Sequence, residues 1–164
     1  MINYFWQKWG KRYWSYVICF LTERQYRNTK LPMVFNTYDV QLELKKLSWK
    51  ADRFFDYFST PQKVVATGEA DCEDLARFAG DRLMTANIPA VILSVLTRPK
   101  ERSHSVCVFK QGGLYSYFDN KKLIETDAQS YAEIAVEVAR GAHVTAWAIH
   151  HPRTLRMIRY WRAK

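Results

Sequence analysis

Apolar positions recur at helical spacing just after residue 71, with polar residues between them. The stripe consists of Cys72, Leu75, Ala76, Ala79 and Leu83. Asp71 is a favourable N-cap, and Asp74 three residues later completes a short-armed capping box. The pattern therefore predicts a helix that begins at Cys72, with its thiol facing the packed interior or the floor of a cleft. Backbone N–H groups and the macrodipole at a helix start lower a thiol pKa and favour a nucleophilic thiolate. A small buried cysteine that begins a helix fits this stretch equally well.

Other helices follow from the same spacing. It predicts helices over residues 39–58, 62–66 and 127–140, an amphipathic aromatic helix within residues 2–27, and a final basic turn or helix over residues 155–161. The aromatic segment is expected to pack on the main body, although its flanking lysines also suit a membrane surface.

A different pattern predicts strands in the second half of the chain. Residues 90–97 form a continuous, largely β-branched apolar run that is typical of a buried strand. Residues 104–110 and 114–119 alternate around Gly112-Gly113, which predicts a hairpin.

The hairpin predicts that a histidine and an aspartate lie close together. If Gly112-Gly113 is a two-residue turn, Gln111 pairs with Leu114, and Val106 lies opposite Asp119. His104 is then a diagonal neighbour of Asp119 on the same face. A four-residue loop preserves this arrangement, whereas a three-residue loop would separate the two side chains. The carboxylate would orient the imidazole as in nucleophile–base–acid triads.

The same alternation narrows the choice of nucleophile. Cys107 is an odd number of residues from His104 and points to the opposite face. Cys19 lies in an aromatic segment and is interpreted as a packing residue. Cys72 is therefore the candidate nucleophile. The later histidines, which we interpret as surface or structural residues, are His143, His150 and His151.

Composition and charge suit a soluble single domain. The 164 residues include 48% hydrophobic and 25% charged side chains, and the formal net charge of +9 is concentrated at the two ends. Residues 1–30 and 151–164 each carry a net charge of +5, whereas the body between them sums to −1. Such ends suit nucleic acid, an anionic surface or an acidic protein, but we favour a solvated basic surface without a specific partner.

Cysteine usage and the N-terminus bear on localisation. Three unevenly spaced cysteines disfavour a disulfide framework and a structural zinc site, so we expect a reducing, cytoplasmic environment. No stretch resembles a signal peptide or is long enough to span a bilayer. The oligomeric state is left open.

Four motifs together resemble the transglutaminase-like superfamily, with the bacterial transglutaminase-like cysteine proteinases as the nearest branch. They are the run GEADCEDLA at residues 68–76, a helix ending in NIPA at residues 87–90, HSV at residues 104–106, and FDN at residues 118–120. The approach DYFSTP at residues 56–61 is also similar, and the resemblance covers roughly residues 47–125. Glu69-Ala70 departs from a more glycine-rich approach to the cysteine, which affects the turn and not the triad.

The resemblance implies a papain-like α+β core in which a cysteine-bearing helix packs on an antiparallel sheet. It implies that Cys72 is the nucleophile, His104 the general base and then acid, and Asp119 the orienting carboxylate. Residues 31–150 would form the catalytic core of one domain spanning residues 1–164, with residues 1–30 and 151–164 as basic extensions.

The resulting hypothesis is a cysteine-dependent amide hydrolase, a peptidase that forms an acyl-thioester on a protein or peptide substrate. Acyl transfer to an amine would use the same residues, and a non-catalytic binding module that uses its basic aromatic ends is a further alternative. No cofactor is required. Some members of the branch bind calcium near the site, but we interpret Asp71, Glu73 and Asp74 as helix-capping residues.

Overall fold

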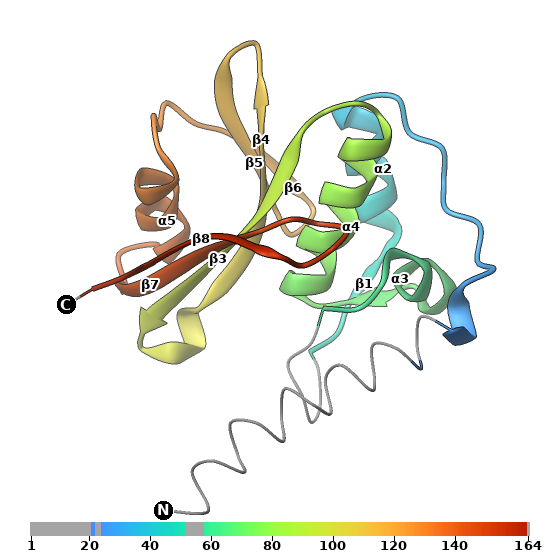
Figure 1. Cartoon of the computed structure of the whole chain (residues 1–164), viewed down its shortest axis with the longest axis horizontal. Coiled ribbons are helices and arrows are strands. Elements are labelled where there is room, and N and C mark those ends of the chain that lie inside the picture. The colour runs from blue at the N-terminus through green and yellow to red at the C-terminus, as the bar shows by residue number, and fades with distance from the viewer. Residues whose placement is uncertain (1–20, 22–23, 52–57, 164) are drawn as a thin grey trace, which may run out of the picture.

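A six-stranded antiparallel sheet with helices on both faces forms the body of the protein (Figure 1). The computed structural model describes residues 21, 24–51 and 58–163. The predicted aromatic helix within residues 2–27 and the packing role of Cys19 fall largely or wholly outside this part. In chain order the elements are α2 (Thr37–Lys46), β1 (Ser48–Trp49), α3 (Pro61–Thr67), β2 (Glu69–Ala70), α4 (Cys72–Thr85), β3 (Ala90–Arg98), η1 (Lys100–Arg102), β4 (His104–Gln111), β5 (Leu114–Asp119), β6 (Lys122–Glu125), α5 (Tyr131–Ala139), β7 (His143–His150) and β8 (Met157–Arg162).

The strand order of the large sheet is β6-β5-β4-β3-β7-β8, so the long strands β3 and β4 lie near its centre. A second, minimal sheet pairs β1 with β2 in parallel and holds the chain just before α4. The antiparallel sheet with several helices confirms the predicted α+β class.

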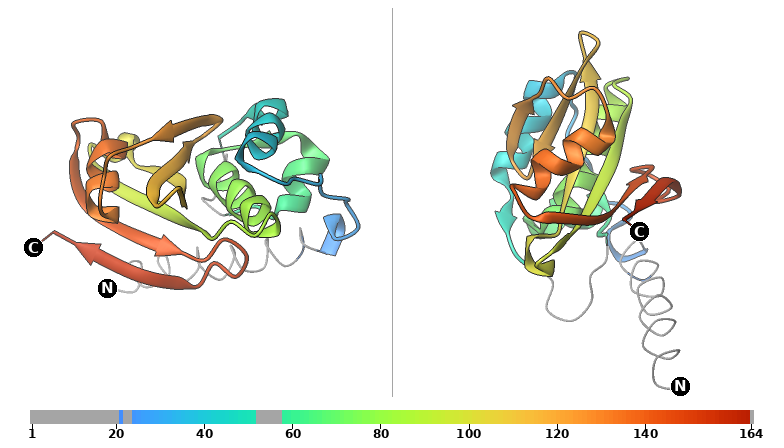
Figure 2. Two further views of the ribbon diagram at one scale, coloured as in Figure 1. Left: turned by 90° about the horizontal axis from the view of Figure 1, so that it is seen from above. Right: turned by 90° about the vertical axis from the view of Figure 1, so that its left-hand side faces the viewer.

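The two faces of the sheet carry separate apolar cores. Ile92, Cys107 and Phe118 pack with residues of α2, α3 and α4, whereas Val95, Val106 and Tyr117 pack with residues of α5. The side chains of a strand alternate between faces, so one strand serves both cores. Figure 2 shows α2, α3 and α4 gathered on one side of the sheet and α5 on the other.

The Cys72 helix forms as the sequence predicts. α4 runs from Cys72 to Thr85, with Asp71 as its N-cap, and the predicted stripe is buried at Leu75, Ala76, Ala79 and Leu83. The short helix expected over residues 62–66 is α3, which begins at Pro61 after an N-cap threonine. The strand at residues 90–97 and the Gly112-Gly113 hairpin are also confirmed as β3, β4 and β5.

Two expectations about helices are wrong. The helix predicted over residues 39–58 ends at Lys46, because Leu47 is extended and the next two residues pair with β2. The predicted C-terminal turn or helix is instead strand β8, whose residues pair with β7. Trp161 lies opposite Trp147, and the stacked rings are 6.3 Å apart between centroids. The stacking of Trp161 on Trp147 favours an extended conformation of residues 157–162 over a helix, because it aligns β8 with β7.

Helix α5 begins after its N-cap Ser130 and ends at Arg140, which adopts a left-handed conformation with φ of 49°. Its extent therefore agrees with the helix predicted over residues 127–140, with a later start. No helix of the described part is long and apolar enough to cross a membrane.

A close helix contact yields a stability prediction. A Cβ at Gly80 in α4 would lie 2.6 Å from Pro152 Cγ and 2.8 Å from its Cβ. Alanine normally stabilises a helix interior relative to glycine. We expect Gly80→Ala to do the opposite and lower the free energy of unfolding by about 1–3 kcal/mol through overpacking. Urea denaturation would measure the loss.

The matched control is Pro152→Gly, which removes the ring that the new methyl group would meet. In a double-mutant cycle, Gly80→Ala should cost less in the Pro152→Gly background than in the native background. An equal cost in both would show that this contact is not the cause.

Candidate active site

The predicted nucleophile, Cys72, is positioned by the start of helix α4. The carboxylate of Asp71 accepts hydrogen bonds from the backbone N–H groups of Glu73 and Asp74, each at 3.0 Å. These bonds satisfy two of the amides that a helix start leaves without intrahelical partners. The half-buried Cys72 side chain therefore occupies the first turn of a well-capped helix.

The predicted base and acid are in direct contact. His104 Nε2 lies 2.7 Å from Asp119 Oδ1, and the two side chains are only 17% and 14% exposed. An ionised carboxylate can only accept, so the Nε2 atom carries the proton and donates it in this bond. In the neutral ring, Nδ1 is then the acceptor. The predicted proximity of His104 and Asp119 is confirmed.

The hairpin register explains this contact. Gln111 pairs with Leu114 and Cys107 with Phe118, as a two-residue Gly112-Gly113 turn requires. His104 and Asp119 therefore extend the same face at the open end of the hairpin.

Arg140 is a second partner of Asp119 that the sequence did not reveal. Its Nη2 atom forms an ion pair with Asp119 Oδ2, while Oδ1 faces His104. The hydrogen bond from His104 is the main cause that holds the pKa of Asp119 below its ordinary value, and Arg140 lowers it further against the opposing effect of burial. Gly141 marked the helix end in the sequence, but no local pattern connected Arg140 with a strand 21 residues earlier.

The thiol and the imidazole belong to different layers of the fold. His104 lies opposite Val95 in the β3–β4 register, and Val95 packs in the core under α5. Helix α4, which begins with Cys72, covers the other face. The structure thus brings His104 and Asp119 together, and it places Cys72 through a separate element.

The two layers converge at one end of the sheet. The 14 residues of α4 span about 21 Å, and β3 returns antiparallel to α4 after a short connection, reaching Val95 after about 17 Å. The start of α4 and Val95, which pairs with His104, therefore both lie away from the connection between α4 and β3. A cavity of about 540 Å³ is lined by Leu75 from the first turn of α4 together with Asp119 and Asn120, which places the helix start beside the acid.

The other cysteine and histidines of the described part have structural environments. Cys107 is fully buried, and burial raises the pKa of its thiol far above the ordinary value. The ring of His150 lies 6.0 Å from that of Phe58, and burial lowers its pKa. His151 Nδ1 accepts the backbone N–H groups of Arg153 and Thr154, each at 3.3 Å. His143 is exposed on β7.

The acidic residues around Cys72 act on the backbone. Asp71 caps α4, and Asp74 accepts a hydrogen bond from the Ser59 amide. Over residues 21, 24–51 and 58–163, no group of three or more His, Cys, Asp or Glu side chains is placed to hold a metal ion. We derive no step through a metal.

Comparison with known proteins supports the fold. No protein-family model matches the chain, and no curated protein matches it by sequence. Solved structures of LapG from Legionella pneumophila, a bacterial transglutaminase-like cysteine proteinase, do match. Sequence identity is 16% in each case. The EGTA-treated form aligns over 78% of this chain and 66% of its own, with a TM-score of 0.51. The calcium-bound form aligns over 78% and 70%, and a third structure over 83% and 72%, both with a TM-score of 0.52.

These matches establish the resemblance that the sequence motifs predicted, at the level of the fold. The chain spans about two thirds of the length of the LapG chains. The bound calcium belongs to one of the LapG structures and is not carried over to this chain.

The Arg140–Asp119 ion pair yields a prediction about pH dependence. A depressed Asp119 pKa contributes stability above the ordinary aspartate value of about 3.9, and this contribution is lost as pH falls through the folded-state pKa. Arg140→Gln should raise the Asp119 pKa and lower the free energy of unfolding at pH 7 by up to about 1 kcal/mol, because Arg140 is largely exposed.

Urea denaturation at a series of pH values would measure this effect. The difference between the native chain and Arg140→Gln should shrink as pH falls through the depressed folded-state pKa of Asp119, because the carboxyl group then becomes protonated in both. Arg140→Lys keeps the positive charge, so its free energy of unfolding at pH 7 should fall less than that of Arg140→Gln. If the loss in free energy of unfolding in Arg140→Gln were the same at every pH, it would not arise from the ion pair with the Asp119 carboxylate.

Proposed function

We propose that the protein is a cysteine peptidase that hydrolyses amide bonds of a protein substrate, with Cys72 as nucleophile, His104 as general base and acid, and Asp119 as the orienting carboxylate. The observation that carries the proposal is the hydrogen bond from His104 Nε2 to Asp119 Oδ1 at the end of the sheet where α4 begins. The LapG-like fold supports a peptidase at the level of architecture.

The protonation pattern of His104 suits a base. Because Nε2 donates to Asp119, the Nδ1 atom carries the lone pair that would take the thiol proton. The imidazolium that forms would be stabilised by the carboxylate, which Arg140 helps to keep ionised. Asp119 would thus act on the ring without taking its proton.

The steps follow from this arrangement. The Cys72 thiolate attacks the carbonyl carbon, and the positive end of the α4 macrodipole favours the negative charge that develops there. His104 then gives its proton to the leaving amine, and the C–N bond breaks to leave a thioester. Water, deprotonated by His104, attacks the thioester and releases the acid and the thiol.

Acyl transfer would differ only in the last step, in which an amine replaces water. A non-catalytic binding module that uses the basic ends would need neither His104 nor Cys72. The two tests below separate these alternatives from the main proposal.

The first test concerns the reactivity of the two described thiols. We expect iodoacetamide to modify Cys72 in the folded protein at pH 5–6, where an ordinary thiol of pKa about 8.5 is almost fully protonated. Cys107 should resist modification because it is buried and its thiol pKa is raised. Peptide-resolved mass spectrometry would measure both rates.

The control for this labelling is the chain unfolded in urea, in which both thiols should react at similar low rates at the same pH. His104→Ala should slow the labelling of folded Cys72 at least about tenfold, whereas His143→Ala should leave it unchanged. A Cys72 rate equal to that of the unfolded chain would contradict an activated thiol.

The second test concerns turnover of protein substrates. A bacterial proteome incubated with the native chain should acquire new peptide N-termini that are absent after incubation with Cys72→Ala. His104→Ala and Asp119→Ala should lower their formation at least about a hundredfold, in line with the loss of general-base catalysis. Mass spectrometry of labelled N-termini would quantify them.

His143→Ala is the matched control, because this histidine is exposed at the start of β7, a strand that pairs with β3 and not with β4 or β5. It should retain native activity. Incorporation of an added biotinylated amine into substrate proteins, without new N-termini, would establish acyl transfer instead. If the native chain produced neither new N-termini nor incorporated amine, the result would favour the non-catalytic binding module.

A further inference from the structure

A second cavity lies on the flank of α4 and is rich in arginine. Its volume is about 770 Å³, within the range of small-molecule sites. Four arginines line it, namely Arg24, Arg27, Arg77 and Arg153, together with the start of α3. Among the described residues of the lining, Asp81 is the single acidic one.

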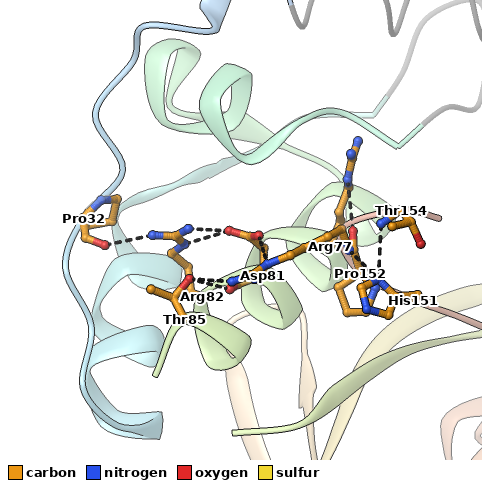
Figure 3. Close-up of polar contacts among 9 residues, drawn as sticks. Pro32, Arg77, Asp81, Arg82, Thr85, His151, Pro152 and Thr154 are labelled. Atoms are coloured by element: carbon orange, nitrogen blue, oxygen red, sulfur yellow. Dashed lines mark hydrogen bonds and ion pairs between the residues drawn. The ribbon is translucent and has the colours of Figure 1, made fainter. Parts of the chain in front are cut away.

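The charge of Asp81 is already shared between two guanidinium groups. Arg82 Nε donates to Asp81 Oδ2 at 3.1 Å, and Arg153 Nε donates to Asp81 Oδ1 at 2.9 Å. Arg153 Nη2 also donates to Thr85 Oγ1 at 3.0 Å, so this guanidinium is held at the cavity wall. Figure 3 shows Arg82 beside Asp81, and the guanidinium of Arg82 also donates to the carbonyl oxygen of Pro32. Both oxygens of the Asp81 carboxylate are thus already engaged by guanidinium groups.

Arg77, one helical turn before Asp81 on α4, is also held in place. It is buried, and its Nη1 atom donates to the carbonyl oxygen of Phe58 at 2.8 Å. Its Nε atom donates to the carbonyl oxygen of Pro152 at 3.3 Å (Figure 3). These bonds fix the orientation of the guanidinium, so Arg77 and Arg153 form a rigid part of the wall.

Arg24 and Arg27 supply the excess positive charge. Both are exposed, and their separation of three residues in a helical turn brings them to one side. Neither forms a hydrogen bond or an ion pair with the residues that the structure describes. Two exposed guanidiniums therefore border a cavity whose other two arginines are fixed by hydrogen bonds.

We propose that this cavity binds a small phosphate-bearing ligand, a nucleoside di- or triphosphate or a similar polyphosphate. The planar fork of arginine matches phosphate oxygens in pairs, and the cationic residues of the described lining are all arginines. Several guanidiniums around one cavity suit a chain of phosphates better than a single carboxylate. The volume leaves space for a ring system beside the phosphates. This proposal does not depend on the peptidase activity.

Isothermal titration calorimetry of the full chain with inorganic triphosphate tests the site. We expect saturable binding at low salt that weakens as salt is raised. Arg24→Gln combined with Arg27→Gln should weaken binding at least about tenfold, since two charge-assisted contacts are lost. Both side chains are exposed, so the fold should be retained, which circular dichroism would verify.

The matched control combines Arg98→Gln with Arg159→Gln. These exposed arginines lie at the end of β3 and on β8, outside the cavity lining, and their replacement removes the same charge. Binding should change less than about threefold, because distant charges are screened. Equal losses in the two double variants, or no binding of triphosphate at low salt, would overturn the proposal.

Adenosine and ATP distinguish the parts of the ligand that are recognised. ATP should bind at least as tightly as inorganic triphosphate, and adenosine should not bind at the same concentrations. If adenosine bound as tightly as ATP, the phosphates would not be the recognised group and the proposal would fail.

Discussion

The packing of α4 against the sheet is the contact on which the rest of the structure depends. Leu75, Ala79 and Leu83 are buried to 1% exposure or less, and each leucine contributes roughly 1.5–3 kcal/mol through burial. Alanine and glycine on the same helix allow a close approach, and Gly80 has no room for a methyl group beside Pro152. The position of the helix along the sheet decides where its first residue, Cys72, meets the end of the strands.

The polar side of α4 is as constrained as its apolar stripe. Asp74, Arg77, Asp81 and Arg82 are all buried, and buried charges are costly unless they are bonded. Their partners come from three distant segments, the carbonyl of Pro32, the backbone of residues 58–59 and the turn at Pro152. The helix thus connects the N-terminal segment, the approach to α3 and the C-terminal hairpin. The arginine-lined cavity lies where these segments meet, because the groups that fix α4 also form its wall.

Local patterns predicted the parts of the fold that depend on neighbouring residues. The capped Cys72 helix and the Gly112-Gly113 hairpin were correct because caps, stripes and tight turns are encoded within a few positions. The hairpin register also predicted the contact between His104 and Asp119. Helix α2 was predicted too long, since Ser48 and Trp49 leave helical geometry to pair with residues 21 positions later. Strand β8 was missed for a similar reason, because its pairing with β7 and the stacking of Trp161 on Trp147 are long-range contacts. No periodicity in the sequence indicates that distant carbonyl groups accept hydrogen bonds from Arg77 and Arg82 of α4.

The candidate site depends both on local patterns and on contacts between distant parts of the chain. The hairpin sets His104 against Asp119, and α5, on the same face, adds Arg140 to the second carboxylate oxygen. Cys72 comes from the layer on the other face, so only the end of the sheet is common to both. Because Nε2 faces Asp119, the proposed proton transfer depends on the Nδ1 edge of the imidazole ring turning toward the start of α4. The catalytic proposal therefore depends on two independent packings, α4 on one face and α5 on the other, and a shift of either helix along the sheet would move one partner relative to the other. Asp119 meets this dependence with two partners: the hydrogen bond from His104 orients the ring, and the ion pair with Arg140 ties that orientation to α5.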